Sequence, residues 1–280
     1  MPELPEAETI VRGIRPAVTE RRIERVRVLR PDIIKTTARN LGNQIRGRTI
    51  RTSSRRGKKV ILELHGGGVI AINLGMTGRV LPFSSPPRGH LRPTQPALRL
   101  HFDNGGILVF DDQRRFGSVE YLDADAWLQR SSSMGPEPLA STFSSRQLHS
   151  ALARSRSPIR SWLLDQKRIA GVGNIYAAEA LFLAGVHPRR PARSVSRQEA
   201  NALYRALRRV LRKAIEAGGT TIRDYRNAEG EEGQYAPRLH VYGRDGEACA
   251  ACGTGVERIV FSNRSAFYCP RCQPEHIGAS

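Results

Sequence analysis

Residues 60–72 read VILELHGGGVIAI, two short runs of apolar, β-branched residues joined by a glycine-rich turn. Such runs are typical of paired β-strands, because β-branched side chains suit a pleated sheet and glycines permit a tight reversal. Similar runs occur at residues 26–28, 98–102 and 107–110. We therefore predict a β-sandwich or barrel-like first half, preceded by a helix over residues 5–18.

The pattern becomes helical after residues 135–138, GPEP. One helix is well defined: Ser196 and Glu199 form a capping box, and apolar residues follow at three-to-four spacing until Gly218. The opposite face carries Arg205, Arg208, Arg209, Arg212 and Lys213. This basic face fits a solvated surface as well as a DNA contact. Residues 84–96, rich in serine and proline, predict a loop.

Charge and hydropathy narrow the possible partners. The chain has 45 Lys and Arg against 26 Asp and Glu, and its formal charge of +19 favours a long polyanion as partner. The opening MPELPE has acids where an export signal has basic residues. The longest apolar window, 169–186, contains Asn174 and Glu179, which favours a buried helix over a membrane span. We expect a cytoplasmic protein that binds nucleic acid and no membrane.

All four cysteines lie near the C-terminus. Cys249 and Cys252 form one CxxC pair, and Cys269 and Cys272 form another after sixteen residues. This spacing is typical of a structural four-thiolate zinc site, whereas two disulfides or unrelated thiols fit a cytoplasmic protein less well. We expect one zinc ion that folds a hairpin and takes no part in chemistry. Arg264 in this hairpin is a candidate DNA contact or an ordinary surface arginine.

Six short motifs occur in one order along almost the whole chain. They are MPELPE at 1–6, GK at 57–58, NLGMTG at 73–78, RRFG at 114–117, GVGNIYA at 171–177 and the CxxC pairs of 249–272. Together they closely resemble the formamidopyrimidine-DNA glycosylase family, bacterial enzymes that remove oxidised purines. The resemblance implies an α+β fold: an N-terminal β-sandwich catalytic domain at 1–130, a helix-two-turns-helix domain at 131–240 and a zinc-finger hairpin at 241–280. It also implies a monomer that acts on damaged or abasic double-stranded DNA in the bacterial nucleoid.

The resemblance assigns chemistry to the N-terminus. Once Met1 is removed, Pro2 is a secondary amine, which can attack the sugar C1′ and form a charged iminium. The iminium acidifies the C2′ proton, so that β- and then δ-elimination cut the strand. Glu3 resembles the family's general acid, which gives a proton to the sugar ring oxygen. Glu6 resembles a supporting carboxylate of the base pocket, and Lys58 resembles the catalytic lysine. Only five of the 45 basic residues are lysines, so the chain favours arginine for general positive charge. A lysine at position 58 is therefore modest independent evidence for a group that can lose its proton.

Other motif residues match the family's DNA contacts. Met76, Arg114 and Phe116 match the residues that fill the space left by an extruded nucleotide, although Met76 and Phe116 would also fit a protein core. An apolar wedge and a stacking ring offset part of the stacking energy lost when a base is extruded. Asn174 would hold the DNA backbone at a helix start, and Glu179 would face the recognition pocket.

Three positions depart from the family pattern. Gln113 stands where a proline usually precedes RRFG, and Arg160 stands where a phosphate-binding lysine is usual, so its positive charge is kept in a different shape. Residues 226–235, RNAEGEEGQY, align with the loop that covers the extruded base and are unusually acidic. An acidic loop should repel phosphate and hold a purine poorly. We therefore expect formamidopyrimidines and abasic sites to be processed better than 8-oxoguanine.

Three other functions fit parts of the sequence. A non-catalytic lesion-binding relative is disfavoured because Pro2, Glu3 and Lys58 are all present. A zinc-ribbon transcription factor would need neither an N-terminal amine nor a β-rich first half. Among enzymes, an endonuclease VIII-like preference for oxidised pyrimidines is the runner-up, although that family typically has glycine where Leu4 stands.

Overall fold

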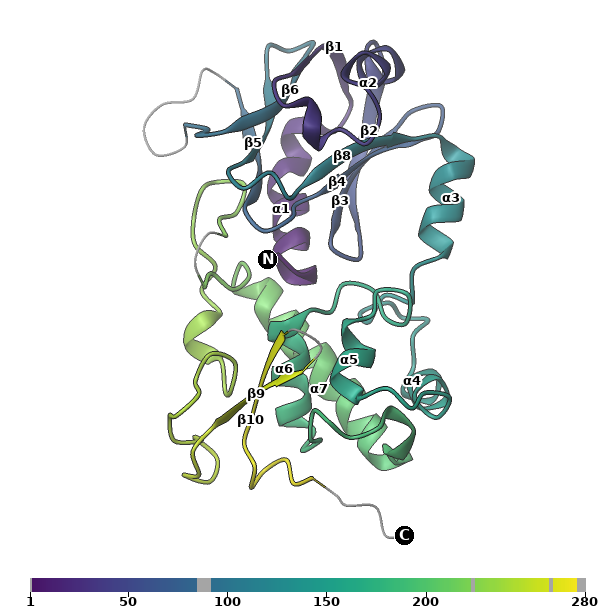
Figure 1. Cartoon of the computed structure of the whole chain (residues 1–280). Helices are drawn as coiled ribbons and strands as arrows, with labels where there is room; N and C mark the ends of the chain where they lie inside the picture. Colours follow the sequence, from purple (N-terminus) through teal and green to yellow (C-terminus); the bar gives the residue numbers. More distant parts are fainter. Residues whose placement is uncertain (1, 85–91, 223–224, 262–263, 276–280) are drawn as a thin grey trace. The chain divides into compact units, whose positions relative to one another are not determined.

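The chain divides into two compact units in a computed structural model that describes residues 2–84, 92–222, 225–261 and 264–275. Unit 1 comprises Met1–Ser133 and Ala214–Ala236, and unit 2 comprises Met134–Lys213 and Pro237–Ser280 (Figure 1). Residues 131–240, which we predicted as one domain, are thus shared between the two units. Within the predicted loop at 84–96, residues 85–91 lie outside the described part of the chain.

Unit 1 is built mainly of β-strands. Its elements are α1 (Leu4–Val18), β1 (Arg21–Val28), a 3₁₀ turn (Pro31–Ile33), α2 (Ala38–Ile45), β2 (Thr49–Arg56), β3 (Lys59–Leu64), β4 (Val69–Asn73), β5 (Gly78–Phe83), β6 (Pro96–Phe102), β7 (Ile107–Asp112), β8 (Ser118–Leu122) and α3 (Ala124–Ser132). The strands form one antiparallel sheet in the order β5-β7-β6-β1-β2-β3-β4-β8. The predicted hairpin at 60–72 is the β3–β4 pair, in which Val60 faces Ile72 and Leu62 faces Ile70.

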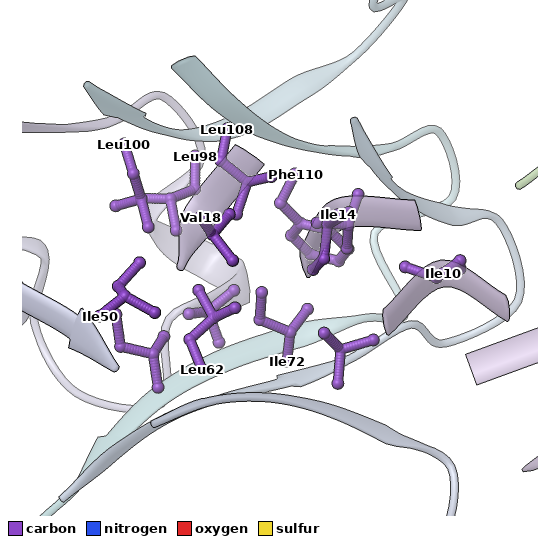
Figure 2. Packing of buried hydrophobic residues seen from close by; sticks show 14 of the residues in the cluster. Ile10, Ile14, Val18, Ile50, Leu62, Ile72, Leu98, Leu100, Leu108 and Phe110 are labelled. Carbon is purple, nitrogen blue, oxygen red and sulfur yellow. The ribbon is translucent and has the colours of Figure 1, made fainter. Parts of the chain in front are cut away.

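The sheet folds into two halves at β1. This strand pairs with β2 only at Arg21 and Arg22, whereas its remaining length pairs with β6. Helix α1 lies between the halves: Ile10, Ile14 and Val18, each four residues apart, are fully buried among side chains of both halves (Figure 2). The facing residues include Ile50, Leu62 and Ile72 on one side and Leu98, Leu100, Leu108 and Phe110 on the other. The predicted β-sandwich with a leading helix is confirmed.

The chain that follows α7 packs in unit 1. The backbone N–H of Thr220 donates to Glu6 Oε1 at 2.8 Å, and the buried Tyr225 hydroxyl donates to the Gly218 carbonyl at 3.1 Å. Gly13 of α1 leaves room for this segment, because a Cβ there would lie 2.7 Å from both Ala228 Cβ and a Glu229 carboxylate oxygen. Sequence periodicity carries no sign of such long-range contacts, so it could not place this segment.

Unit 2 is mainly helical. Its elements are α4 (Ser145–Leu152), α5 (Ile159–Leu164), α6 (Asn174–Leu183), a 3₁₀ turn (Ala192–Ser194), α7 (Arg197–Glu216, whose last turn belongs to unit 1), a 3₁₀ turn (Ala236–Arg238, which begins at the boundary), β9 (Glu257–Phe261) and β10 (Arg264–Tyr268). The predicted capping box of α7 is present: the Glu199 N–H donates to Ser196 Oγ at 3.2 Å, and the Ser196 N–H donates to Glu199 Oε2 at 2.8 Å. Helix α6 is buried from Ile175 to Phe182, as the apolar window predicted, and no described helix is long and apolar enough to span a membrane.

The basic residues of α7 lie in two different environments. Arg208 donates to the carbonyls of Pro138 and Ala140 at 2.7 and 3.0 Å, and its guanidinium lies over the Tyr204 ring. It therefore anchors α7 to the preceding chain. The other basic residues of this face are exposed: Arg205, Arg209, Arg212 and Lys213.

Candidate functional site

The start of α1 holds two buried carboxylates beside Pro2. Glu3 is the N-cap residue and is 2% exposed, and Glu6 is 1% exposed. Their side chains form a capping box with the helix backbone, in which the Glu3 N–H donates to Glu6 Oε2 at 2.7 Å. Because Glu6 Oε1 also accepts from Thr220, this carboxylate fixes the backbone next to Pro2 as well as the chain that follows α7.

Lys58 lies in the β2–β3 turn, which has two side-chain anchors. Arg55 donates to Glu8 Oε2 of α1 at 3.1 Å and to the Gly57 carbonyl at 2.8 Å, and Arg56 donates to Ser131 of α3. Gly57 has a positive φ of 60°, a left-handed conformation that favours glycine. Arg55 and Glu8 thus tie the turn that carries Lys58 to the helix that begins beside Pro2. No local sequence signal indicates either residue, because the two lie 47 positions apart.

The three predicted wedge residues lie on two adjacent turns of unit 1. Met76 and Phe116 are 36% and 57% exposed, so neither is a core residue. The Arg114 guanidinium lies 4.9 Å from the centroid of the Phe116 ring, a cation–π contact. Because the Phe116 ring and the Met76 thioether are exposed to water, the free energy of moving them into an apolar gap is favourable.

Asp112 joins these two turns. Its Oδ1 accepts from Thr77 Oγ1 at 2.6 Å, and its Oδ2 accepts from the Gly117 N–H at 2.7 Å. Thr77 Oγ1 in turn accepts from the Arg114 N–H at 3.0 Å. The turns also approach closely, because a Cβ at Gly75 would lie 2.5 Å from the backbone of Phe116 and Gly117. Nothing in the sequence marks Asp112 for this role, because its pattern is that of the last residue of a strand.

In unit 2, the buried Arg160 and the half-buried Asn174 form a polar cluster. Arg160 is 1% exposed and donates to Asn174 Oδ1 at 2.7 and 3.2 Å, to the Ser265 carbonyl at 2.9 Å and to the Phe261 carbonyl at 3.4 Å. Asn174 Nδ2 also donates to Ser265, at 3.0 Å. Burial, and then the charge of Arg264, lowers the pKa of Arg160 to about 10. Arg160 was predicted as a DNA contact, and this stays a prediction; within the protein its guanidinium binds the start of α6 and the β9–β10 hairpin.

Arg264 is exposed at the start of β10, where it faces Phe261 across the hairpin. The Arg160 guanidinium also lies 4.8 Å from the centroid of the Phe261 ring. The hairpin end that presents Arg264 is therefore held in place by Arg160.

Glu179 is fully buried on α6. Its carboxylate accepts from the backbone N–H groups of His240, Val241 and Tyr242 at 2.8–3.0 Å and lies 2.9 Å from His240 Nδ1. We predicted that Glu179 would face a base-recognition pocket. The structure shows both of its oxygens occupied by residues 240–242, which lead into the cysteine-rich region.

The four cysteines form a metal-ligand cluster. Their Sγ atoms all lie within 4.8 Å of one another, with Cys249 and Cys272 at 4.0 Å and Cys252 and Cys269 at 3.5 Å. Four thiolates around zinc at ~2.3 Å lie about 3.8 Å apart, so the cluster fits one structural zinc ion. Gln273, fully buried, accepts from the Cys269 N–H at 3.0 Å and donates to the Val186 carbonyl at 2.9 Å. Gln273 thus anchors the second CxxC pair to the chain after α6, a role that the sequence did not reveal.

The acidic segment 226–235 is ordered by its own contacts within unit 1. Arg226 pairs with Glu232 at 2.8 Å, and Asn227 Oδ1 accepts from the N–H groups of Glu229 and Glu231. Part of its negative charge is therefore neutralised internally, and Glu229 lies against Gly13 of α1.

Comparisons with known proteins agree along the whole chain. Family models match residues 1–119 (Formamidopyrimidine-DNA glycosylase N-terminal domain), 134–226 (Formamidopyrimidine-DNA glycosylase H2TH domain) and 246–274 (Zinc finger found in FPG and IleRS). A formamidopyrimidine-DNA glycosylase of Dinoroseobacter shibae is 41% identical over 98% of this chain and 100% of its own. The MutM (Fpg) structure of Thermus thermophilus is 40% identical, with a TM-score of 0.86 over 98% of this chain and 99% of that one. The complex of Lactococcus lactis Fpg with abasic-site DNA is 32% identical, with a TM-score of 0.89 over 98% and 100%.

Proposed function

Since the chain belongs to the formamidopyrimidine-DNA glycosylase family, we propose that it excises oxidised bases, formamidopyrimidines and 8-oxoguanine among them, from double-stranded DNA and then cleaves the strand as an abasic-site lyase. We place it in the bacterial cytoplasm, on nucleoid DNA, as a single chain. One zinc ion held by the four cysteines supplies structure and no chemistry. We retain three functional parts, residues 1–130 for catalysis, 131–240 for DNA binding and 241–280 for the zinc finger.

The buried carboxylates beside Pro2 are the observation that carries this proposal. A secondary amine at the N-terminus attacks the sugar C1′, the bond to the base breaks, and the ring opens as Glu3 gives a proton to the ring oxygen. Glu3 is only 2% exposed and lies next to Pro2, where its carboxyl group would supply this proton. The iminium then loses its C2′ proton, and the 3′ and 5′ phosphates leave in turn by β- and δ-elimination.

Glu6 and Lys58 support this step in different ways. Glu6 holds the Glu3 N–H and Thr220, so its proposed role is to orient the N-terminus, and not to contact the base edge directly. Lys58 sits on a turn tied to α1 through Arg55 and Glu8, which supports a position beside the N-terminal amine. Its ammonium would bind a phosphate next to the lesion and move a proton to or from the base.

DNA binding is assigned to three groups. Met76, Arg114 and Phe116 fill the space of the extruded nucleotide. Asn174, at the first turn of α6, contacts the backbone, and Arg264 of the zinc hairpin enters a groove or binds phosphate. Arg160 and Glu179 act through other residues: Arg160 orients Asn174 and the hairpin, and Glu179 orients residues 240–242.

Borohydride trapping tests the proposal directly. Reduction of an iminium should link the protein covalently to a duplex with an abasic site, in a 1:1 complex. Retention of Met1, or an N-terminal extension, should abolish trapping while the affinity for an uncleavable abasic analogue stays within about threefold. Trapping that persists after the amine is blocked would move the nucleophile to another amine, with Lys58 as the first candidate.

A panel of lesion duplexes tests the substrate range. We expect single-turnover excision of formamidopyrimidines, and cleavage of abasic sites, to be faster than excision of 8-oxoguanine, because Glu229 and Glu231 add negative charge to the covering loop. Glu229→Gln/Glu231→Gln should narrow this difference. Fastest excision on 8-oxoguanine opposite cytosine would contradict the expected preference, and fastest excision on oxidised pyrimidines would support the endonuclease VIII-like alternative.

A further inference from the structure

Four basic side chains line one face of the β1–β6 pair in unit 1. Arg25 faces His101, and Arg27 faces Arg99, directly across the two strands. The intervening pairs, Val26 with Leu100 and Val28 with Leu98, point into the core. Since successive side chains of a strand alternate between faces, the four basic residues share the outer face. We call this set, Arg25, Arg27, Arg99 and His101, the β1–β6 basic face.

The arginines of this face have no acidic partner among the described residues. Arg27 opposite Arg99 is a like-charge cross-strand pair, and like charges directly opposite each other destabilise a sheet. The neighbouring strand β7 carries two carboxylates, and both are occupied. Asp111 is bound by Arg79 and the Gln95 N–H, and Asp112 by Thr77 and the Gly117 N–H. The fold therefore keeps a concentration of positive charge here at a cost in stability.

The pKa of His101 is affected by the same concentration of positive charge. Burial, and then the charges of Arg25, Arg27 and Arg99, lower the pKa of His101 below its usual value. Its Nε2 is buried and has no hydrogen-bond partner in the described parts of the chain. On β7 the residue opposite His101 is Ile107, which contributes no charge. A neutral imidazole among three guanidinium groups is the expected response to an unbalanced positive field.

This face is separate from the proposed catalytic residues. Helix α1, which begins beside Pro2, packs against the inner side of the sheet with Val26, Val28, Leu98 and Leu100 in the same core. The β1–β6 basic face is on the opposite side of the same strands. A duplex whose lesion reaches Pro2 approaches the start of α1, whereas this face looks away from α1.

We propose that the β1–β6 basic face binds the phosphate backbone of a second DNA segment while the catalytic residues hold the first. Guanidinium groups bind phosphate through paired N–H donors, and unpaired arginines do so without first losing an ion pair. Residues two apart on a strand are about 6.8 Å apart, which is close to the rise of two base pairs, ~3.4 Å each, along the DNA helix axis. The face would let the enzyme pass directly from one DNA segment to another during its search.

A two-duplex binding experiment tests this proposal. The full-length zinc-bound protein is first saturated with a short duplex that contains an uncleavable abasic analogue. A second, fluorescent, undamaged duplex is then titrated at several salt concentrations. We expect the preformed complex to bind one further equivalent, and Arg25→Gln/Arg27→Gln/Arg99→Gln to weaken this second binding at least tenfold. The dependence of log affinity on log salt should become shallower by about 2–3, since each lost phosphate contact contributes ~0.9.

A matched control variant separates the effect of this face on second-duplex binding from the effect of net charge. Arg51, Arg130 and Arg244 are each paired with a carboxylate, so replacing all three with glutamine removes the same formal charge elsewhere. This control should change second-duplex binding less than about twofold. Both triple variants should excise a lesion from the short duplex at the wild-type rate, which also keeps the outcome independent of the chemistry assigned to Pro2.

Three results would overturn the proposal. They are absence of second-duplex binding by the wild-type complex, equal weakening in the two triple variants, and capture of poly-aspartate in place of DNA by the β1–β6 basic face. The last result would assign the face to an acidic protein segment.

Discussion

The side-chain oxygen of Asn174 accepts two hydrogen bonds from the Arg160 guanidinium, at 2.7 and 3.2 Å. The same guanidinium donates to the carbonyls of Phe261 and Ser265 in the zinc hairpin. One buried cation therefore fixes two candidate DNA-contact elements, the start of α6 and the hairpin that carries Arg264. A lysine at this position has one ammonium and could not reach three acceptors in the same fork geometry.

Arg160→Met should separate this positioning role from direct DNA contact. The change leaves Asn174 Oδ1 without its donor and removes the guanidinium hydrogen bonds to the Ser265 and Phe261 carbonyls, so the free energy of unfolding should fall by roughly 2–4 kcal/mol, with each buried orphan group costing ~1–3 kcal/mol. Affinity for abasic-analogue DNA should fall about tenfold, while bound zinc stays at one per chain. Arg258→Met, at an exposed hairpin arginine, is the control. A similar loss of stability in both variants would argue against a special role for Arg160.

Alanine at Met76, Arg114 or Phe116 should impair base extrusion more than strand cleavage. Unstacking a base costs a few kcal/mol, and each wedge residue offsets part of it, so single-turnover excision from an intact duplex should slow by roughly 10- to 100-fold. Cleavage at a pre-formed abasic site should slow less than about threefold. Leu128→Ala, at a 70% exposed residue of α3, provides a matched control that should change neither rate. Equal slowing of both reactions would mean that the wedge residues act on the chemistry or on general DNA affinity.

Cys269→Ser should release zinc and weaken DNA binding. The hairpin between the CxxC pairs depends on four thiolates that bind zinc. Loss of the zinc ion should unfold this hairpin and remove Arg264 from the DNA, while unit 1 keeps its fold. Zinc measured by a colorimetric chelator should fall from one per chain to near zero, and DNA affinity should fall at least tenfold. Gln273→Ala should still bind zinc but release it faster to the chelator, because the four thiolates remain while the hydrogen bonds to the Cys269 N–H and the Val186 carbonyl are lost. Full activity in a zinc-free protein would refute the structural role of the metal.

Stability should decline as the pH falls from 7.5 toward 5.5. Burial lowers the pKa of His187 below 6.5, and its Nδ1 accepts a hydrogen bond from the Arg189 N–H at 3.3 Å, which requires an unprotonated ring nitrogen. Between the folded and unfolded pKa values the unfolded chain binds more protons, so acidification favours unfolding. Thermal unfolding at several pH values should show this slope, and His187→Asn should flatten it. His101→Asn should flatten it as well, since the pKa of His101 is also lowered. An unchanged slope in the double variant would place the pH dependence in other groups.

The sequence predicted the features that depend on local pattern. The hairpin at 60–72, the buried first helix, the Ser196–Glu199 capping box and the two CxxC pairs all depend on spacing within a short window. It did not predict that Arg160 is buried, because the same residue type suits a phosphate contact and a buried clamp. Nor did it place the chain after α7 with unit 1, since the Glu6–Thr220 hydrogen bond joins residues 214 positions apart. Partners of buried polar groups are set by the fold as a whole, and periodicity does not encode them.

Asp112 gives the wedge a mechanical property. Its two oxygens hold the Thr77 hydroxyl and the Gly117 N–H, so the turn with Met76 and the turn with Phe116 share one brace. If Met76 and Phe116 form the proposed wedge, we expect the thioether and the ring to enter a base stack together and not one after the other. Such a wedge would probe DNA in an all-or-none way: a base pair that resists both side chains would be passed over, and a weakened pair would yield to both at once.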